Sequence, residues 1–397
     1  MADTLRFGVM GLGRAGTGML AAMANHPDIK VTAAADLYQE HLDRFAADFG
    51  GQTFKNAEDM LRSPDVDAVY VATPHQFHAE HVELAASYGK HIIVEKPMAL
   101  TLEECDRMIA AAEKAGVKMI VGHTASYNPS IKTMRELIIS GEVGNLGMIS
   151  ATAYTDFLYR PRRPEELVTE MGGGIIFNQT PHQVDAARFL AGGKAKSVRA
   201  ATFIMDPTRP TEGGSMAFLE FENGAAASLV YSGYDHLDSS DLAATRAPKA
   251  ADAYGKARRV LAQVHTSEEE VALRVSTGYG GESQVTRTRG GGGSLLQGEL
   301  GSFIVTCQGA DLRLAPEGVG YYGTDGYRVV PAKPWRGVAG RGDVIDELYY
   351  AVTEARPLVH TGRWAKATME VCFAILQSSR EHREITLQHQ VPTVDLE

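Results

Sequence analysis

Cysteine is scarce in this chain, which excludes several classes of protein. The 397 residues contain three cysteines, Cys105, Cys307 and Cys372, and no C-x-x-C pair. Spacings this wide fit neither a disulfide framework nor a cysteine zinc site. We therefore expect three reduced, buried thiols in a cytoplasmic protein.

Long apolar runs and excess positive charge are also missing. No run of 18 apolar residues exists, and strand-like sequence begins by Leu5, so neither a membrane span nor a signal peptide is expected. Lys and Arg number 39 against 49 Asp and Glu, a net charge of −10, which makes nucleic acid an unexpected partner. An anionic small molecule would have to be bound by local arginines.

A glycine-rich turn lies between the strand-like run Arg6–Met10 and the helix-like run Thr17–Asn25. Asp36 ends a second strand-like run, Val31–Ala35, at the interval of about 20 residues that a dinucleotide-binding fold requires. The turn reads Gly11-Leu12-Gly13-Arg14-Ala15-Gly16. We predict that these six residues and Asp36 bind a dinucleotide.

Each glycine of this turn has a physical role. Gly11 permits the tight turn, Gly13 lets the backbone approach a pyrophosphate, and Gly16 allows close helix packing. The carboxylate of Asp36 can accept hydrogen bonds from a ribose 2′-hydroxyl and repels a 2′-phosphate. Because no cation follows it directly in the sequence, NAD is predicted rather than NADP.

The first 125 residues alternate strands and helices, which predicts a doubly wound parallel sheet, the Rossmann NAD-binding domain. Helices are expected at Ala79–Tyr88 and at Leu102–Ala115, the second opened by a Thr101–Glu104 capping box. The expected strands are Arg6–Met10, Val31–Ala35, Ala68–Ala72, His91–Glu95 and Lys118–Gly122.

Residues 126–340 are predicted to form an α+β domain for substrate binding and oligomerisation, built on a mostly antiparallel sheet. A polar, glycine-rich insertion near 235–300 interrupts it, and helices near 342–381 are expected to pack back on the first domain. The expected strands are Leu146–Asp156, Ser197–Met205, Ser215–Phe221, Ala225–Gly233, Val271–Val275, Gly301–Cys307 and Asp311–Ala315.

Two segments carry candidate chemistry. Thr73-Pro74 and Glu95-Lys96-Pro97 each follow a strand of the parallel sheet, at the edge where ligands bind, so Lys96 can move a proton beside the cofactor. In the second domain, Thr180 is a candidate N-cap for a helix reaching about Leu190, with His182 in its first turn. The positive helix end favours a neutral imidazole, and a carboxylate three residues on, at Asp185, can orient the ring. His182 can equally serve only to pack the helix start.

Together the glycine turn, Ala72-Thr73-Pro74 with His78, Glu95-Lys96-Pro97 and His182-x-x-Asp185 resemble the glucose–fructose oxidoreductase and inositol dehydrogenase family (Gfo/Idh/MocA). The resemblance implies that Lys96 and His182 lie at the hydride-transfer site, and that Thr73, Pro74, His78, Glu95 and Lys96 surround the cofactor. Many polyol-oxidising members carry aspartate where this chain has Asn178, so a complete Asp–His–Lys relay is not expected, although Asn178 stays a candidate site residue.

A narrower resemblance, carried by residues 157–167 and 206–213, is to phthalate 4,5-cis-dihydrodiol dehydrogenases. It implies oxidation of a carboxylated cis-dihydrodiol, with guanidinium groups as bidentate partners of the carboxylates. The candidate arginines are Arg160, Arg162, Arg163 and Arg209, and Tyr127 is a further candidate for the pocket. The arginines can instead form a solvated surface loop, and Tyr127 can be a packing residue.

The resulting hypothesis is an NAD-dependent dehydrogenase, cytoplasmic and homo-oligomeric through its second sheet, with Lys96 as proton acceptor. One alternative is a sugar or cyclitol dehydrogenase of the same family, and another is an NAD-binding regulatory protein without turnover. No metal is predicted, because His75, His78 and His81 follow a strand end of the dinucleotide domain and fit structural or cofactor-contact roles better than zinc.

Overall fold

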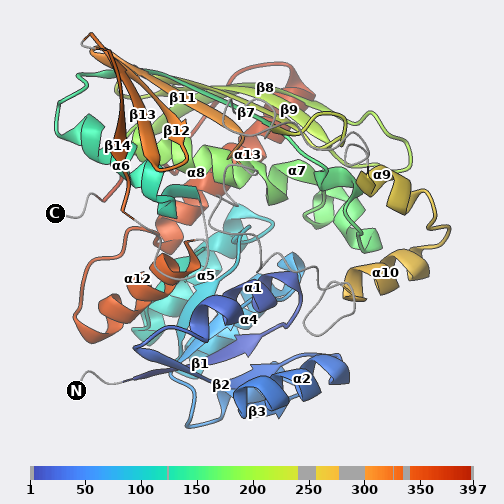
Figure 1. Ribbon diagram of the computed structural model, residues 1–397. Coiled ribbons are helices and arrows are strands. Elements are labelled where there is room, and N and C mark those ends of the chain that lie inside the picture. The colour runs from blue at the N-terminus through green and yellow to red at the C-terminus, as the bar shows by residue number, and fades with distance from the viewer. Residues whose placement is uncertain are drawn as a thin grey trace.

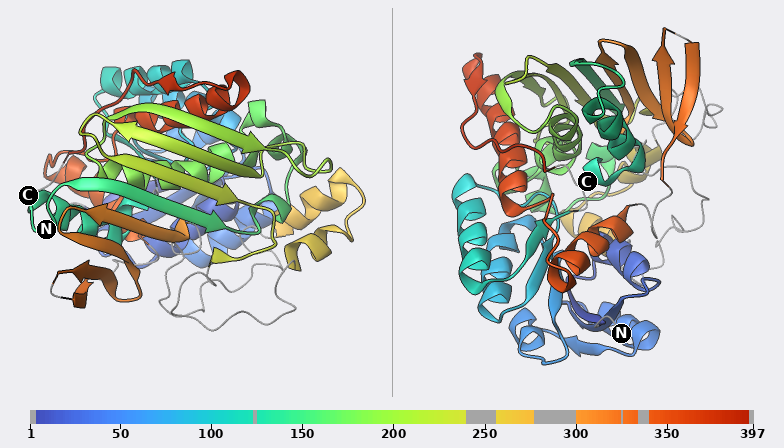
Figure 2. Two further views of the ribbon diagram at one scale, coloured as in Figure 1. Left: turned by 90° about the horizontal axis from the view of Figure 1, so that it is seen from above. Right: turned by 90° about the vertical axis from the view of Figure 1, so that its left-hand side faces the viewer.

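Two sheets, one above the other in Figure 1, organise the computed structural model. The structure describes residues 4–122, 125–239, 256–276, 300–324, 326–333 and 340–394. The lower sheet comes from the first part of the chain and the upper sheet from the second. Helices fill the space between the two sheets, so the ends of several elements from both halves meet there (Figures 1 and 2).

The lower sheet is a six-stranded parallel Rossmann sheet with strand order β3-β2-β1-β4-β5-β6. Its strands are buried apolar runs, as expected when helices cover both faces. The strands are β1 (Leu5–Met10), β2 (Ile29–Ala35), β3 (Gln52–Phe54), β4 (Ala68–Val71), β5 (His91–Val94) and β6 (Met119–Val121). The helices of this part are α1 (Arg14–Met23), α2 (Gln39–Phe49), α3 (Ala57–Leu61), α4 (His78–Ser87) and α5 (Leu102–Ala115). The Rossmann prediction is confirmed.

The upper sheet has nine strands in the order β14-β13-β12-β11-β7-β10-β9-β8-β15. Only the β7–β10 pair is parallel, so the prediction of a mostly antiparallel sheet is also confirmed. The strands are β7 (Leu146–Tyr154), β8 (Ala195–Phe203), β9 (Gly214–Phe221), β10 (Ala226–Ser232), β11 (Ser302–Cys307), β12 (Ala310–Ala315), β13 (Gly318–Gly323), β14 (Gly326–Pro331) and β15 (Ile385–Thr386). One face packs on helices, and the other is open in the left view of Figure 2.

Helices from late in the chain connect the two halves. Helix α12 (Arg341–Thr353) packs on α1 and β5, and α13 (Gly362–Glu381) packs on α5, α8 (Thr180–Leu190) and β8. The apolar face of α12 joins the core under the Rossmann sheet, where Val344 and Leu348 belong to one cluster with Tyr70 and Ile93. Arg188 of α8 donates to the Trp364 carbonyl at 3.0 Å and stacks over its ring. The remaining helices are α6 (Pro129–Ile139), α7 (Gly174–Asn178), α9 (Lys256–Leu261) and α10 (Ser267–Ser276).

One predicted strand was wrong. Val271–Val275 lies inside α10, although its β-branched residues are typical of strands. Thr266 and Glu269 form a reciprocal capping box at the start of this helix, with Glu269 N–H donating to Thr266 Oγ1 at 3.2 Å and Thr266 N–H donating to Glu269 at 3.3 Å. Much of the predicted insertion near 235–300 lies outside the described residues.

The three cysteines are free and buried, as expected. Burial raises the pKa of the Cys105 thiol to about 12 and that of Cys307 to about 11, so neither is a reactive thiolate near neutral pH. Among the helices that the structure describes, none combines the length and apolar character needed to cross a membrane.

Candidate active site

The glycine turn has the geometry of a phosphate cradle. Gly11 has φ +90°, and a Cβ there would lie 2.7 Å from the Ala72 carbonyl oxygen, so only glycine fits. A Cβ at Gly16 would lie 2.0 Å from the Gly11 oxygen. At Gly13, by contrast, a Cβ would meet nothing within 4 Å, although this residue caps α1. The open side of Gly13 therefore gives a pyrophosphate access to the helix N-terminus.

Asp36 stands at the ribose end of this cradle. Its carboxylate accepts the Leu12 N–H at 2.7 Å and the Tyr38 N–H at 2.8 Å, and it lies 3.2 Å from His41 Nδ1. Burial opposes ionisation of Asp36, but these hydrogen bonds outweigh burial and lower its pKa, so it is a carboxylate at neutral pH. The residues fit a dinucleotide, with Arg14 exposed and Ala15 half-buried in the first turn of α1.

Hydrogen bonds to Glu95 fix the loop after β5. The Tyr70 hydroxyl donates to Glu95, and Glu95 accepts the Lys96 backbone N–H at 3.1 Å. Glu95 is buried, and these two hydrogen bonds make it a support of the Lys96 loop. Lys96 is half-buried, and its peptide bond to Pro97 is cis.

Lys96 connects the two halves of the molecule. Its Nζ donates to the backbone carbonyl of Asn178, at the end of α7, at 2.8 Å. The Asn178 side chain points elsewhere, donating to the carbonyls of Gly172 at 2.9 Å and Gly174 at 2.8 Å. Asn178 was predicted as a catalytic and substrate-binding residue, and this role stays a prediction. In the structure its backbone oxygen positions Lys96, and its amide N–H groups fix the glycine turn.

His182 lies in the first turn of α8 and is 1% exposed. Burial, followed by the positive charges of Lys96 and Arg341, holds its pKa well below the usual range, so the imidazole is neutral. The neutral imidazole expected from the sequence stays a prediction, and the main cause of the lowered pKa in this structure is burial. Thr180 was expected to cap this helix; it is instead the first residue of α8, and its hydroxyl has no hydrogen-bond partner.

Asp185 does not orient His182, contrary to the sequence-based expectation. Its carboxylate accepts the Ser126 N–H at 2.8 Å, the Ser126 hydroxyl, and the Trp364 indole N–H at 2.7 Å. The network continues through His360, whose Nε2 lies 2.7 Å from Ser126 Oγ, to Glu347 of α12. Asp185 therefore locks α8 to the loop after β6 and to α13.

Tyr127 belongs to the same network and does not line a pocket. It is 1% exposed, its hydroxyl donates to Glu347 at 2.8 Å, and its ring stacks on His360 with centroids 3.8 Å apart. The packing role, which the sequence left open, is the one observed. Burial and the Glu347 charge raise the Tyr127 pKa well above its usual value, so the hydroxyl keeps its proton.

The loop after β4 is fixed by two histidines. His78 is fully buried, with Nδ1 2.9 Å from the Pro97 oxygen and Nε2 2.9 Å from the Thr73 oxygen, so it ties this loop to the Lys96 loop. We assign it to positioning and not to direct cofactor contact. Thr73 Oγ1 pairs with His81 Nδ1 at 2.9 Å, and Pro74 is half-buried beside it. Across the described ranges, no cluster of three metal-ligating side chains occurs.

His75, which the sequence assigned with His78 and His81 to a structural or cofactor-contact role, lies at the site. A Cβ on Gly172 would lie 3.0 Å from its Nδ1, so the ring sits against the loop that supports Asn178. Burial, then the positive charges of His78 and Lys96, lower its pKa to about 3. The available signal was its place directly after Thr73-Pro74, at the strand end where ligands bind.

The four predicted arginines are paired with carboxylates of the protein. Arg160 bonds Asp156 at 2.9 Å, Arg163 lies 3.4 Å from Glu166, and Arg209 bonds Glu270 of α10 at 2.7 Å. A substrate carboxylate would have to displace these partners.

Arg162 is likewise engaged and is not a surface residue. Its Nη2 donates to the Phe157 carbonyl at 2.7 Å, and its guanidinium stacks on the Phe157 ring. Burial lowers the pKa of Arg162 to about 9. The predicted arginine cluster exists, but it is an ion-pair network beneath α10, and not a set of open guanidinium groups.

Another arginine does border the site. Arg341, the first residue of α12, is half-buried, and a Cβ on Gly18 of α1 would lie 3.0 Å from its guanidinium carbon. Its charge acts on both His182 and Tyr70. No local motif marks Arg341 in the sequence, because its position depends on the return of α12 to the first domain.

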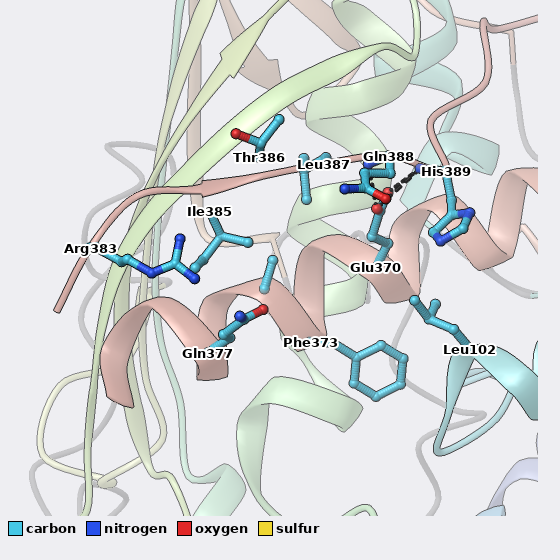
Figure 3. Close-up of a pocket in the computed structure, with 11 residues that line it drawn as sticks. Leu102, Glu370, Phe373, Gln377, Arg383, Ile385, Thr386, Leu387, Gln388 and His389 are labelled. Carbon is cyan, nitrogen blue, oxygen red and sulfur yellow. Dashed lines mark hydrogen bonds between the residues drawn. The ribbon is translucent and has the colours of Figure 1, made fainter. Parts of the chain in front are cut away.

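A separate cavity of about 390 Å³ lies between α13 and the segment that follows it (Figure 3). Leu102, Phe373 and His389 are among the residues that line it, and none of the candidate catalytic residues does. Glu370 in its wall accepts the backbone N–H groups of Gln388 and His389, which fixes the C-terminal segment. The cavity is therefore not the candidate active site.

Comparison with known proteins agrees with this geometry. Residues 5–123 match the oxidoreductase family model with an NAD-binding Rossmann fold, and residues 131–245 match the Gfo/Idh/MocA C-terminal domain. A Comamonas testosteroni protein, 1-carboxy-3-chloro-3,4-dihydroxycyclohexa-1,5-diene dehydrogenase, is 37% identical over 95% of each chain. The chain belongs to the Gfo/Idh/MocA family. It is an NAD(P)-dependent dehydrogenase.

Two further proteins are also similar to this chain, one in sequence and one in both sequence and solved structure. An inositol 2-dehydrogenase from Rhizobium meliloti (strain 1021) is 27% identical over 70% of this chain and 80% of its own length. A crystal structure described as a dehydrogenase from Bordetella bronchiseptica RB50 is 44% identical, covers 96% of this chain and 100% of its own, and superposes with a TM-score of 0.89. The chain is thus similar both to a cyclitol dehydrogenase and to a dehydrogenase named for a carboxylated diol.

Proposed function

We propose that this protein oxidises a carboxylated cis-dihydrodiol with NAD as the hydride acceptor, and that phthalate 4,5-cis-dihydrodiol, which would give 4,5-dihydroxyphthalate, is the first candidate. The observation that carries the proposal is the meeting of Lys96 from the Rossmann domain with Asn178 and His182 from the second domain, beside the cofactor loops. A proton acceptor is thereby held next to the place where a hydride is removed.

In the proposed reaction, one C–H bond and one O–H bond of the secondary alcohol break and a C=O bond forms. NAD, when bound, supplies the hydride acceptor. Lys96 Nζ, held by the Asn178 carbonyl, accepts the hydroxyl proton directly or through water. The neutral His182 can hydrogen-bond the same hydroxyl or its neighbour without competing for that proton. The ketone then tautomerises to an aromatic catechol, which makes the oxidation effectively irreversible.

The preference for NAD over NADP is part of this proposal. Asp36 is ionised, so its carboxylate suits a ribose 2′-hydroxyl and repels a 2′-phosphate. One cation does lie at this loop, because Lys55 Nζ donates to the Leu37 carbonyl at 2.9 Å. The ionised Asp36 is the nearer determinant, since it caps the glycine turn itself through the Leu12 N–H.

The substrate class rests on the relative from Comamonas testosteroni, whose name describes a carboxylated dihydroxycyclohexadiene, and which matches 95% of this chain. A cyclitol is the alternative, since an inositol dehydrogenase is also a relative. The test is NADH formation by the purified protein with cis-4,5-dihydrodihydroxyphthalate, with a monocarboxylated cis-dihydrodiol, and with inositol. Rapid NADH formation with either carboxylated diol supports the proposal. Activity confined to inositol, or no activity with any of the three, contradicts it.

We also propose that a second copy of the chain covers the open face of the upper sheet, which none of the described helices covers in Figure 2. Met148, Met216, Phe218 and Ile304 project from this face on β7, β9 and β11, and Phe218 is 50% exposed. Light scattering of the wild type and of Phe218→Glu tests the idea. A wild-type oligomer that dissociates in Phe218→Glu supports it, and a monomeric wild type contradicts it.

A further inference from the structure

A carboxylated substrate needs a cation near Lys96 that the protein has not already neutralised. The predicted arginines do not meet this condition, because Arg160, Arg163 and Arg209 hold carboxylates of Asp156, Glu166 and Glu270. The protein as a whole carries a charge of −10, which repels an anion unless a local charge offsets it.

Arg341 meets the condition. Its Nε is buried without a hydrogen-bond partner, and within the residues that the structure describes no carboxylate forms an ion pair with it. A buried Nε–H group without an acceptor is costly, because its desolvation is not offset by a hydrogen bond. A ligand that supplies an oxyanion would remove this cost.

Arg341 lies on the face of α12 that is directed toward Lys96 and His182. Arg341 and Val344, one turn apart, share a face of α12, and a Cβ on Gly122, the residue after β6, would lie 3.5 Å from Val344. This face of α12 therefore turns toward the carboxyl ends of the strands, where Lys96 and His182 lie. The influence of the Arg341 charge on His182 agrees with this placement.

A cofactor phosphate is the rival ligand. The Arg341 guanidinium lies against Gly18, whereas the phosphate cradle is at Gly13, five residues earlier in α1. At a rise of about 1.5 Å per residue, the two points are roughly 7.5 Å apart along the helix. The geometry thus favours a ligand beside His182 over the pyrophosphate.

We propose that Arg341 forms a carboxylate-binding site beside Lys96 and His182, and that it determines the preference for a carboxylated over an uncarboxylated diol. This inference rests on the proposed function for its substrate. The site would take a carboxylate bidentately through the guanidinium fork. Such a pair contributes enough binding energy for a discrimination of about 10- to 100-fold.

The test compares wild type, Arg341→Gln, Arg341→Lys and the control Arg356→Gln, which removes an exposed arginine that pairs with Glu354 beyond the far end of α12. Kd values for 3,4-dihydroxybenzoate and for catechol are measured on the NADH complex, and kcat/KM is measured with the carboxylated diol and with cis-benzene dihydrodiol. NADH titration and thermal unfolding show that each variant is folded.

Arg341→Gln is expected to weaken 3,4-dihydroxybenzoate and the carboxylated diol by about 10- to 100-fold, to leave catechol and the uncarboxylated diol nearly unchanged, and to keep NADH affinity. Arg341→Lys should lose less, and Arg356→Gln should match the wild type. Unchanged discrimination in Arg341→Gln, or a loss of NADH affinity with discrimination retained, would overturn the site. The benzoate titration needs no turnover, so it tests Arg341 even if the wild type fails to oxidise any diol and the proposed function falls.

Discussion

Asp185 gives the sharpest test of how the site is built. If its network describes its role, Asp185→Asn will destabilise the junction between α8 and α13 without changing the chemistry at His182. If Asp185 orients the imidazole, the same substitution will damage catalysis and spare stability. The two roles thus predict opposite results for one variant.

The expected magnitude follows from the donors that Asp185 satisfies. The carboxylate is 1% exposed and accepts N–H groups of Ser126 and Trp364 as well as the Ser126 hydroxyl. The hydroxyl can turn to His360, which lies 2.7 Å away, so two buried N–H donors depend on Asp185. Each stranded donor costs about 1–3 kcal/mol, and an amide keeps one acceptor oxygen. Asp185→Asn therefore strands one donor, and we expect it to lower the unfolding free energy by roughly 1–3 kcal/mol.

The assay pairs denaturant unfolding with a pH profile of kcat/KM, and uses Asp311→Asn, at an exposed position on β12, as the control. Asp185→Asn should keep kcat/KM within about threefold of wild type at a temperature where it stays folded. The acid limb of its pH profile of kcat/KM should lie at the same pH as in wild type. Wild-type stability together with a loss of about 100-fold in kcat, or a shifted acid limb, would refute the structural role of Asp185.

The remaining predictions concern the glycine turn at Gly11–Gly16 and His75. Gly13→Ala should keep the fold, because its Cβ meets nothing within 4 Å, but weaken NADH by about tenfold or more in a fluorescence titration, whereas Gly16→Ala should lose thermal stability. Wild-type NADH affinity in Gly13→Ala would contradict the cradle. His75 titrates at about 3 when folded and near its ordinary value of 6.5 when unfolded, so the unfolded state binds more protons between these values and stability falls as pH drops. His75→Gln should remove up to about 1.4 kcal/mol per pH unit from that slope, and equal slopes would show the assignment to be wrong.

The Rossmann half was predictable because its signals are local. Buried parallel strands are continuous apolar runs, so β1, β4 and β5 lie within a residue or two of their predicted ends, and α5 agrees at both ends. The short edge strand β3 and the hairpin β13–β14 were missed, since short or glycine-rich strands carry weak patterns.

The site was predictable only in part. Lys96 and His182 were found because each follows a recognisable local signal, a strand end and a helix start. The partners of Asp185, Tyr127 and Arg209 depend on contacts between residues distant in sequence, such as Arg209 with Glu270. Arg341 reaches the site only through the packing of α12 on α1, which no local pattern encodes.

The central claim is that Lys96 accepts the hydroxyl proton of the substrate during hydride transfer. The rate of hydride transfer in the Lys96→Met variant tests it most directly. Wild type and variant, each saturated with NAD⁺, are mixed rapidly with the carboxylated cis-dihydrodiol, and NADH absorbance is followed over a single turnover. Loss of a positioned proton acceptor should slow NADH formation by about 10²- to 10⁴-fold while the Kd for NADH stays at the wild-type value. NADH formation by Lys96→Met at a rate near that of wild type would contradict the role of Lys96.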